Sequence, residues 1–292
     1  MNTHLLFKIA EQEVVVFDGA MGTMLMNAGL PAGGPPELWN TEKPEVIQAI
    51  HRAYYAAGSH VVHTNTFGAN AVKLGEYGQA GSMARLNQAA VEIARKACPA
   101  GRLVAGDMGP SGKMLKPAGD AAADDLEDAF FRQAGVLIAA GVDLISIETM
   151  FSLEEALCAV RGAKRAGSCP VIGATTYNRT PRGFFTIMGE DVKTCAAALE
   201  KAGVDVVGTN CSMGSHDMID LTAELRSATR LPILVQPNAG SPVADESGVR
   251  YEQTPAEFGR DAAAIKAAGA DMIGGCCGTD ADFIRALKTA VA

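Results

Sequence analysis

A short repeat at the start of several apolar runs constrains the fold more than any other feature of this sequence. It reads Ala-Gly, then two residues, then an apolar pair, and its copies begin at Ala57, Ala140, Ala202 and Ala268. Each copy follows an alanine-rich segment whose apolar residues recur at three- and four-residue steps, as in a helix packed on one face. The glycine is expected to end that helix in a left-handed cap. The repeat therefore predicts joints at which a helix is followed by a strand.

Short β-rich runs alternate with helical segments along the whole chain. The eight runs are Val14–Phe17, His60–Thr64, Leu103–Gly106, Asp143–Ile147, Val171–Ala174, Val204–Val207, Ile233–Gln236 and Asp271–Gly274. The helical segments include Glu45–Ala57, Ser82–Ala97, Leu126–Ala140, Leu153–Ala166, Thr194–Ala202, Met218–Thr229 and Pro255–Ala268. This alternation predicts an α/β fold with a parallel sheet. Eight strands in 292 residues predict one domain, residues 1–292, folded as a single (β/α)8 TIM barrel.

A doubly wound open sheet is the alternative arrangement. It is disfavoured because no Gly-x-Gly-x-x-Gly follows the first run and no Walker sequence occurs. No linker, low-complexity tract or long charge run divides the chain. The segments rich in Gly, Pro and polar residues at Ala28–Glu37, Lys113–Asp125 and Tyr177–Asp191 are expected to be long βα loops.

Charge and hydropathy restrict the class of protein. The formal net charge of −8 leaves no basic excess to meet phosphates, which argues against a general nucleic-acid binder. No apolar stretch approaches the length of a membrane span, and Met1–Lys8 has no basic region leading into an apolar segment. Seven cysteines, an odd number, fit reduced thiols better than a disulfide framework. We expect a cytoplasmic protein without membrane or nucleic-acid partners.

Polar residues collect just after the runs, at the strand ends where barrels of this kind hold their active sites. Asp18 and Glu148 are the carboxylates expected to face the cavity, to receive a ligand ammonium or to act as acid and base. The Gly19–Gly22 turn offers backbone N–H groups to a ligand carboxylate. Three further polar residues there, Asp107, Asn178 and Asn238, are equally well explained as residues that hydrogen-bond within loops.

Two strand ends also carry cysteines flanked by glycines: Cys211, and the adjacent pair Cys276 and Cys277. Three thiolates predict a site for a soft metal, zinc above all, with the fourth position open as in catalytic sites. Plain core packing and a strained vicinal disulfide are the alternatives for the adjacent pair. A metal could bind a ligand sulfur, the backbone amides a ligand carboxylate, and the carboxylates a ligand ammonium. Together these groups describe a site for an amino-acid thiol.

The remaining cysteines and the histidines carry less information. We expect Cys98, Cys158, Cys169 and Cys195 to pack as small hydrophobic residues. His60 and His63 are expected to be structural, and His216 to lie in a polar loop.

Four segments resemble the homocysteine S-methyltransferase family, and most closely its cobalamin-linked branch, the homocysteine-binding barrel of cobalamin-dependent methionine synthases. They are Asp18–Thr23, Thr64–Gly68, Gly208–Cys211 and Gly274–Thr279. The resemblance covers nearly the whole chain and implies a zinc-containing barrel. It assigns the metal to Cys211, Cys276 and Cys277, and homocysteine binding to Asp18, Gly19, Glu148 and, less directly, Thr66.

The resemblance also bears on the methyl donor. The betaine-using branch has an aromatic residue after the strand-four glutamate, where this chain has Thr149, and the S-methylmethionine branch departs from Thr64–Phe67. Both points favour the cobalamin-linked branch. No Asp-x-His-x-x-Gly cobalamin signature occurs in the 292 residues, so the methyl donor is expected to be a free small molecule or a separate corrinoid protein.

The sequence therefore predicts a zinc-dependent methyltransferase that activates homocysteine as a zinc-bound thiolate and methylates it to methionine, with no catalytic residue beyond the zinc site. The donor is expected to be a methylcorrinoid such as methylcobalamin. Betaine- or S-methylmethionine-dependent transfer is the nearest alternative. A non-catalytic metal-binding subunit of a methyltransferase complex and a hydrolytic zinc barrel are alternatives from other classes; hydrolytic barrels prefer His and carboxylate ligands.

Overall fold

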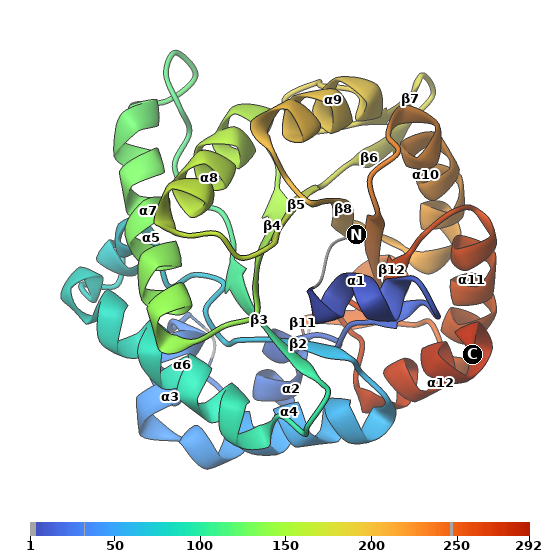
Figure 1. The fold of residues 1–292 in the computed structure, drawn as a ribbon, viewed down its shortest axis with the longest axis horizontal. Coiled ribbons are helices and arrows are strands. Elements are labelled where there is room, and N and C mark those ends of the chain that lie inside the picture. Colours follow the sequence, from blue (N-terminus) through green and yellow to red (C-terminus); the bar gives the residue numbers. More distant parts are fainter. Residues whose placement is uncertain (1–3, 32, 246–247) are drawn as a thin grey trace.

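Eight parallel strands form a barrel at the centre of the molecule (Figure 1). The computed structural model describes residues 4–31, 33–245 and 248–292. The barrel strands are β1 (Val15–Val16), β2 (Val61–His63), β3 (Leu103–Met108), β4 (Leu144–Met150), β5 (Val171–Thr175), β8 (Val206–Gly214), β9 (Ile233–Asn238) and β12 (Met272–Ile273). Residues 1–3 of the N-terminal segment and residue 32 of the first predicted loop lie outside the described residues.

The strand order around the barrel is β1-β12-β9-β8-β5-β4-β3-β2. A bridge between Phe17 and Val61 and a 2.7 Å hydrogen bond from His60 N to Val16 O join β1 to β2 and so complete the ring. The predicted (β/α)8 barrel is confirmed, and the open-sheet alternative is wrong. Each predicted run overlaps one barrel strand, and β3, β4, β5, β8 and β9 extend beyond the predicted ends.

A ring of helices surrounds the strands (Figure 1). The main helices are α4 (Pro44–Ala57), α6 (Met83–Ala97), α7 (Ala123–Ala140), α8 (Leu153–Ala166), α9 (Val192–Ala202), α10 (Ser215–Ala228), α11 (Pro255–Ala267) and α12 (Ala281–Val291). Shorter helices are α1 (Leu5–Ala10), α2 (Met21–Asn27), η1 (Pro36–Leu38), α3 (Trp39–Glu42), α5 (Ala71–Gly75) and η2 (Ala80–Ser82). The seven predicted helical segments are all found, and α12, which was not among them, packs between α11 and α4. None of the described helices combines the length and apolarity that crossing a bilayer requires.

The repeat forms the helix-to-strand joints as predicted. Its glycines have left-handed backbone angles: φ is 111° at Gly58, 101° at Gly141, 90° at Gly203 and 112° at Gly269. Two residues after each glycine, a side chain accepts a hydrogen bond from a backbone N–H of the neighbouring strand. These pairs are His60 with Val16, Asp143 with Val104, Asp205 with Val171 and Asp271 with Ile233. The repeat therefore fixes strand position as well as helix length.

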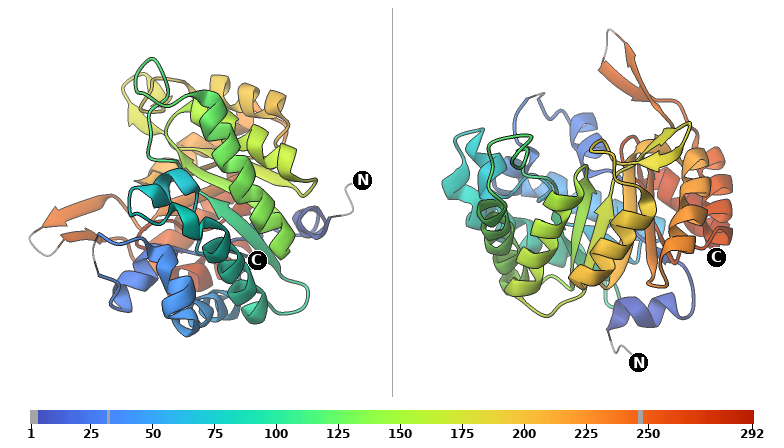
Figure 2. Two further views of the ribbon diagram at one scale, coloured as in Figure 1. Left: turned by 90° about the vertical axis from the view of Figure 1, so that its left-hand side faces the viewer. Right: turned by 90° about the horizontal axis from the view of Figure 1, so that it is seen from above.

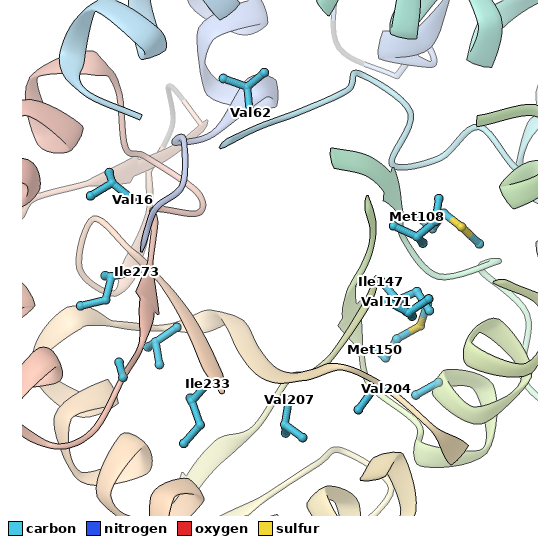
Figure 3. Packing of buried hydrophobic residues seen from close by; sticks show 14 of the residues in the cluster. Val16, Val62, Met108, Ile147, Met150, Val171, Val204, Val207, Ile233 and Ile273 are labelled. Carbon is cyan, nitrogen blue, oxygen red and sulfur yellow. The ribbon is translucent and has the colours of Figure 1, made fainter. Parts of the chain in front are cut away.

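The core has two layers. Inside the barrel lie Val15, Phe17, Val61, Leu103, Ala105, Leu144, Ile172, Val206, Leu234 and Met272. Alternate strand residues such as Val16, Val62 and Ile147 point away from the barrel towards the helices (Figure 3). Fully burying one such aliphatic side chain contributes about 1.5–3 kcal/mol. The alternation fixes which residues face the interior, and so which can form a site at its mouth.

The two ends of the barrel differ (Figure 2). At the amino ends of the strands lies α1, and its Leu6 is part of the inner apolar layer. At the opposite end, the hairpin of β10 (Pro242–Asp245) and β11 (Gly248–Tyr251) projects from the molecule. A second hairpin, β6 (Asn178–Thr180) with β7 (Gly183–Phe185), occupies part of the predicted loop Tyr177–Asp191. The carboxyl end is therefore the open one.

Candidate metal centre

The structure brings together the three cysteines that the sequence singled out. Cys211 lies within β8, and Cys276 and Cys277 follow β12. Their sulfurs all lie within 4.8 Å of one another, and Cys277 Sγ is 4.0 Å from each of the other two. Three sulfurs bound to one tetrahedral zinc at about 2.3 Å would be about 3.8 Å apart. The donor set and its spacing therefore fit zinc.

No other group of three or more His, Cys, Asp or Glu ligands this close together occurs in the described part of the chain. All seven cysteines are free. The 4.0 Å between the sulfurs of Cys276 and Cys277 is about twice a disulfide bond length, so a vicinal disulfide is not formed. Of the other four, Cys158 and Cys195 are buried, whereas Cys98 and Cys169 are only partly buried.

The three thiols share their protons unevenly. Hydrogen bonds from Cys211 and Cys276 lower the pKa of Cys277 to about 3, against the opposing effect of burial. The pKa of Cys276 is raised well above its usual value, because its thiol is hydrogen-bonded to the other two sulfurs and is buried. One thiolate is therefore favoured within the cluster, and thiolate is the form of cysteine that binds metals.

The backbone at the site is strained. Among the described residues other than glycine, φ is positive only at Thr149 (59°), Cys211 (62°) and Ser212 (67°). At the same two places the pairing register shifts, between Ile147 and Met150 in β4 and between Asn210 and Gly214 in β8. Such irregularities re-aim side chains and cost on the order of 1–3 kcal/mol for each unusual residue. They occur beside Glu148 in β4 and at Cys211 in β8.

Asn210 connects these two irregular strand ends. Its Oδ1 accepts from Thr149 N at 2.7 Å, and its Nδ2 donates to Thr149 Oγ1 at 2.8 Å. The same Nδ2 lies 3.8 Å from Cys276 Sγ. Asn210 thus links the strand end that carries Glu148 to the cysteine cluster. Sequence reasoning gave it no role, although its position directly before Cys211 was a signal.

The glycines around the cysteine pair make room for the protein's own side chains. A Cβ at Gly275 would lie 2.3 Å from Thr279 Oγ1, and that hydroxyl donates to Cys276 O at 2.7 Å. At Gly278, φ is 83° and a Cβ would lie 2.4 Å from the ring of Tyr251 on β11. Thr279 and Tyr251 therefore hold the backbone of the cysteine pair in place.

Asp18 forms a buried ion pair with His63. Asp18 Oδ2 accepts from His63 N at 2.9 Å, and Asp18 Oδ1 lies 2.7 Å from His63 Nδ1. Burial lowers the pKa of His63, but the charge and hydrogen bond of Asp18 outweigh it and raise that pKa to about 10. The charged imidazole can also donate from Nε2 to Ser146 Oγ at 3.1 Å. His63 is therefore structural, and it engages both oxygens of the carboxylate that was expected to face a ligand.

Glu148 is the only residue of β4 that is not buried. Burial of its carboxyl raises the pKa, the charge of His63 opposes this, and the charges of Asp18 and Cys277 add to it. The charge of Cys277 in the cysteine cluster thus affects the pKa of Glu148.

Gly19 directly follows Asp18 along the chain, and Thr66 comes three residues after His63. Thr66 is fully buried, and its Oγ1 donates to Asp107 O at 2.7 Å. Next to Gly19, Ala20 N donates to Thr279 O and Thr279 Oγ1, and α2 begins at Met21. Of the segment Gly19–Gly22, which was expected to be a turn, Gly19 and Ala20 lead into a helix and Met21 and Gly22 begin it.

His60 and His216 lie outside the cysteine cluster. His60 accepts from Val16 N at the amino end of the barrel, and His216 is exposed on the first turn of α10.

The fold and the site together define a class of protein: a (β/α)8 barrel with three cysteines gathered at the carboxyl ends of its strands. The sequence model of the homocysteine S-methyltransferase family matches residues 15–291. The chain belongs to this family.

Relatives of known name agree with this assignment. The chain is 36% identical to a methionine synthase of Mycobacterium leprae, in an alignment that covers 100% of the chain and 25% of the relative. A methionine synthase of Mycobacterium tuberculosis is 35% identical, with 98% of the chain and 25% of the relative covered. The chain thus spans about a quarter of the length of the curated relatives it matches.

Among solved structures, the oxidized form of the homocysteine methyltransferase MmuM from Escherichia coli has a TM-score of 0.80 at 24% identity, covering 98% of this chain and 99% of that one. Its metallated form has a TM-score of 0.78 at 24% identity, covering 97% of this chain and 98% of that one. At this identity the likeness shows a shared fold.

Proposed function

We propose that this chain, as one barrel domain, binds zinc and homocysteine and transfers a methyl group to the homocysteine sulfur to give methionine. Membership of the homocysteine S-methyltransferase family supports the reaction. The observation that carries the proposal is the group of three free cysteine sulfurs within 4.8 Å of one another at the open end of the barrel.

Cys211, Cys276 and Cys277 would hold the zinc. A set of three thiolates suits zinc or a softer metal and leaves one coordination position for a substrate sulfur. When bound, zinc favours the deprotonated form of a thiol that ligates it, and the thiolate is the nucleophilic form. The metallated form of MmuM is a precedent for metal binding by a protein of this fold.

The other site residues would bind the amino-acid part of homocysteine. Glu148, which is only partly buried at the end of β4, is proposed to contact the ammonium. The amide of Gly19 is proposed to receive the carboxylate. Asp18 and Thr66 are proposed to support the site. Asp18 contributes its charge and its hydrogen bond with His63, and Thr66 fixes the backbone at Asp107 by a hydrogen bond.

In the transfer itself, the homocysteine thiol releases its proton to solvent. The thiolate sulfur then forms a bond to the methyl carbon as the bond from that carbon to the donor breaks, and the donor keeps the electron pair of the broken bond. This in-line displacement needs alignment more than proton transfer, so no side chain is assigned as general acid or base. The contribution of the chain is to fix the sulfur and the amino-acid group in one orientation.

We propose a methylcorrinoid as the methyl donor, either free or bound to protein. The curated relatives are methionine synthases about four times as long as this chain, since it covers 25% of their length. Seven of the eight large apolar or aromatic side chains exposed among the described residues lie in β-to-α segments around the barrel mouth: Met26, Phe67, Tyr77, Met114, Phe151, Ile187 and Met188. Such an apolar rim suits contact with a corrinoid-carrying protein.

A methyl-transfer assay tests the proposal. Zinc-loaded protein and homocysteine are offered methylcobalamin, S-methylmethionine or betaine separately, and methionine is measured. We expect methionine with methylcobalamin, and none above background with the Cys276→Ser variant. The Cys98→Ser variant, changed far from the cluster, is the matched control and should behave as wild type. Methionine formed only from S-methylmethionine or betaine would contradict the donor. Failure both to bind homocysteine and to form methionine would contradict the function.

A further inference from the structure

Asp107 is a buried carboxyl without a hydrogen-bond partner at the floor of the barrel mouth. It is 6% exposed, and its Oδ1 contacts no hydrogen-bond partner in the part of the chain that the structure describes. On β3, Ala105 belongs to the inner apolar layer and Met108 to the outer one. The alternation of a strand therefore turns Asp107 inward. Sequence reasoning left this residue between a site role and a loop role.

The backbone N–H and carbonyl of Asp107 are both held by threonines of the segment that follows β2. Its N–H donates to Thr64 Oγ1 at 3.1 Å, and its carbonyl accepts from Thr66 Oγ1 at 2.7 Å. The two threonine hydroxyls are themselves 2.6 Å apart. The position of the carboxyl is therefore determined by the strand pair, although the carboxyl itself takes no part in holding the strands together.

The neighbouring polar groups are already engaged with one another. Asp107 pairs in register with Ser146 on β4, and Ser146 Oγ contacts the imidazole of His63. His63 in turn engages both oxygens of Asp18. Two residues beyond Ser146, Glu148 is only partly buried. Unlike Asp18, it has no hydrogen bond from its carboxyl to a described residue. The floor thus holds the paired carboxylate of Asp18, the buried and unpaired carboxyl of Asp107, and the partly exposed carboxyl of Glu148 on the strand next to Asp107.

These two carboxyls lie across the mouth from the cysteines. In the closed strand order, β3 is four strands from β9 in either direction. β9 lies between β8, which carries Cys211, and β12, which precedes Cys276 and Cys277. A ligand with its sulfur at the cysteines would therefore extend its other end towards β3 and β4.

We propose that Asp107 is a substrate-binding residue that, together with Glu148, forms a two-carboxylate seat for the ammonium group of homocysteine. Leaving the carboxyl of Asp107 buried and unpaired costs free energy, and a ligand cation placed between it and Glu148 would offset that cost. The register pairs Asp107 with Ser146, so Glu148 lies two residues further along the adjacent strand. The pKa of Asp107 is raised well above its usual value, first by burial and next by the charge of Glu148. The seat selects amino-acid thiols over thiols without an amino group. This inference rests on the proposed function, since it takes homocysteine as the ligand.

Calorimetric titration with two ligands tests the seat. Zinc-loaded wild type and the Asp107→Asn variant are titrated with homocysteine and with 4-mercaptobutanoate, which has the same chain and carboxylate but no amino group. Loss of one charged hydrogen-bond partner should weaken homocysteine binding about 10- to 100-fold. Binding of 4-mercaptobutanoate should change less than about threefold, because the asparagine keeps the shape of the side chain.

Two further variants make the result decisive. Asp205→Asn makes the same substitution at the amino end of the barrel and should leave both affinities unchanged. If Asp107→Asn fails to fold, Asp107→Ser is titrated in its place with the same expectation. Unchanged homocysteine affinity, or equal weakening of both ligands, would overturn the seat and make Asp107 a structural residue. Such a result leaves the proposed function intact if wild type still binds homocysteine. Wild type that binds neither ligand would remove the proposed function and this inference with it.

Discussion

The two ends of the barrel use the same residue types in opposite ways. At the amino end, the aspartates of the repeat each accept a backbone N–H and each pair with a basic side chain: Asp143 with Arg95, Asp205 with Lys164 and Asp271 with Arg226. At the carboxyl end, the carboxyls of Asp107 and Glu148 have no such partners among the residues that the structure describes. A satisfied carboxylate positions a strand, whereas an unsatisfied one at the mouth is available to a ligand.

The backbone differs in the same way. The amino end is regular, its positive φ angles fall on glycines, and α1 lies across it. The carboxyl end holds Thr149, Cys211 and Ser212 in left-handed conformations that are unfavourable for these residues. The favourable packing of the regular end and of the two-layer core offsets the free-energy cost of the strained backbone at the carboxyl end. Substitutions at the two ends should therefore affect different measurements.

Loss of one metal ligand should give the largest effect. Loss of a residue that only hydrogen-bonds to a metal ligand weakens metal binding roughly 10- to 100-fold. Cys276→Ser should weaken zinc binding by more than this, because it removes a ligand itself and leaves two thiolates where three are needed. Zinc content of the purified protein, measured against the Cys98→Ser variant, checks this. Full zinc retention would remove Cys276 from the ligand set.

The ion pair of His63 with Asp18 is an exception to this comparison, because it lies at the carboxyl end and is expected to stabilise the fold. Breaking a buried pair by removing one partner typically costs about 3–5 kcal/mol, and His63→Gln should lower the free energy of unfolding by about this amount near pH 6. The folded-state pKa of about 10 lies above the unfolded value of about 6.5. The contribution of the charged His63 is therefore complete below pH 6.5 and declines as the pH rises towards 10.

Urea unfolding of wild type and His63→Gln at several pH values between 6 and 10 measures this gap. Comparing the two proteins at each pH cancels the titration of other groups. A gap that stays constant across this range would show that His63 is neutral in the folded protein.

Glu148→Gln should weaken homocysteine binding by about 1.5–3 kcal/mol, the usual worth of a hydrogen bond to a charged group. Zinc content and the free energy of unfolding should be unchanged, because Glu148 is assigned to the ammonium and is not hydrogen-bonded within the described protein. Glu154→Gln, an exposed position on α8, is the control. Loss of zinc in the variant would make Glu148 a ligand or a structural residue instead.

The sequence predicts the features that depend on local order along the chain. The alternating runs gave the eight strands, the repeat glycines gave the helix ends, and the cysteines at strand ends gave the cluster. The β6–β7 hairpin was missed because its first strand, Asn178–Thr180, is exposed and lacks a buried alternating face. A local pattern contains no signal for such a strand.

Features that depend on contacts across the barrel were beyond sequence reasoning. The pairing of Asp18 with His63 and of Asn210 with Thr149 depends on which inward residues meet, and on bulges at the ends of β4 and β8. No propensity rule places a β-branched residue such as Thr149 at positive φ. The cysteines were predictable because their chemistry is rare, whereas Asp107 has the same residue type as the structural aspartates of the repeat.

The smallest expected effect comes from the amino end and tests the comparison from the other side. Asp205→Ala removes the acceptor for Val171 N at 2.9 Å and the partner of Lys164 Nζ at 2.7 Å. The ion pair is partly exposed and contributes little, but the N–H of buried Val171 is left without its acceptor, so the free energy of unfolding should fall by about 1–2 kcal/mol. Homocysteine affinity and zinc content should stay within about twofold of wild type, because the strand is displaced only at its far end. Urea unfolding and homocysteine titration on the same preparation check both statements. A loss of affinity comparable to that of Glu148→Gln, with stability unchanged, would show that the two ends are coupled and that the division between them is wrong.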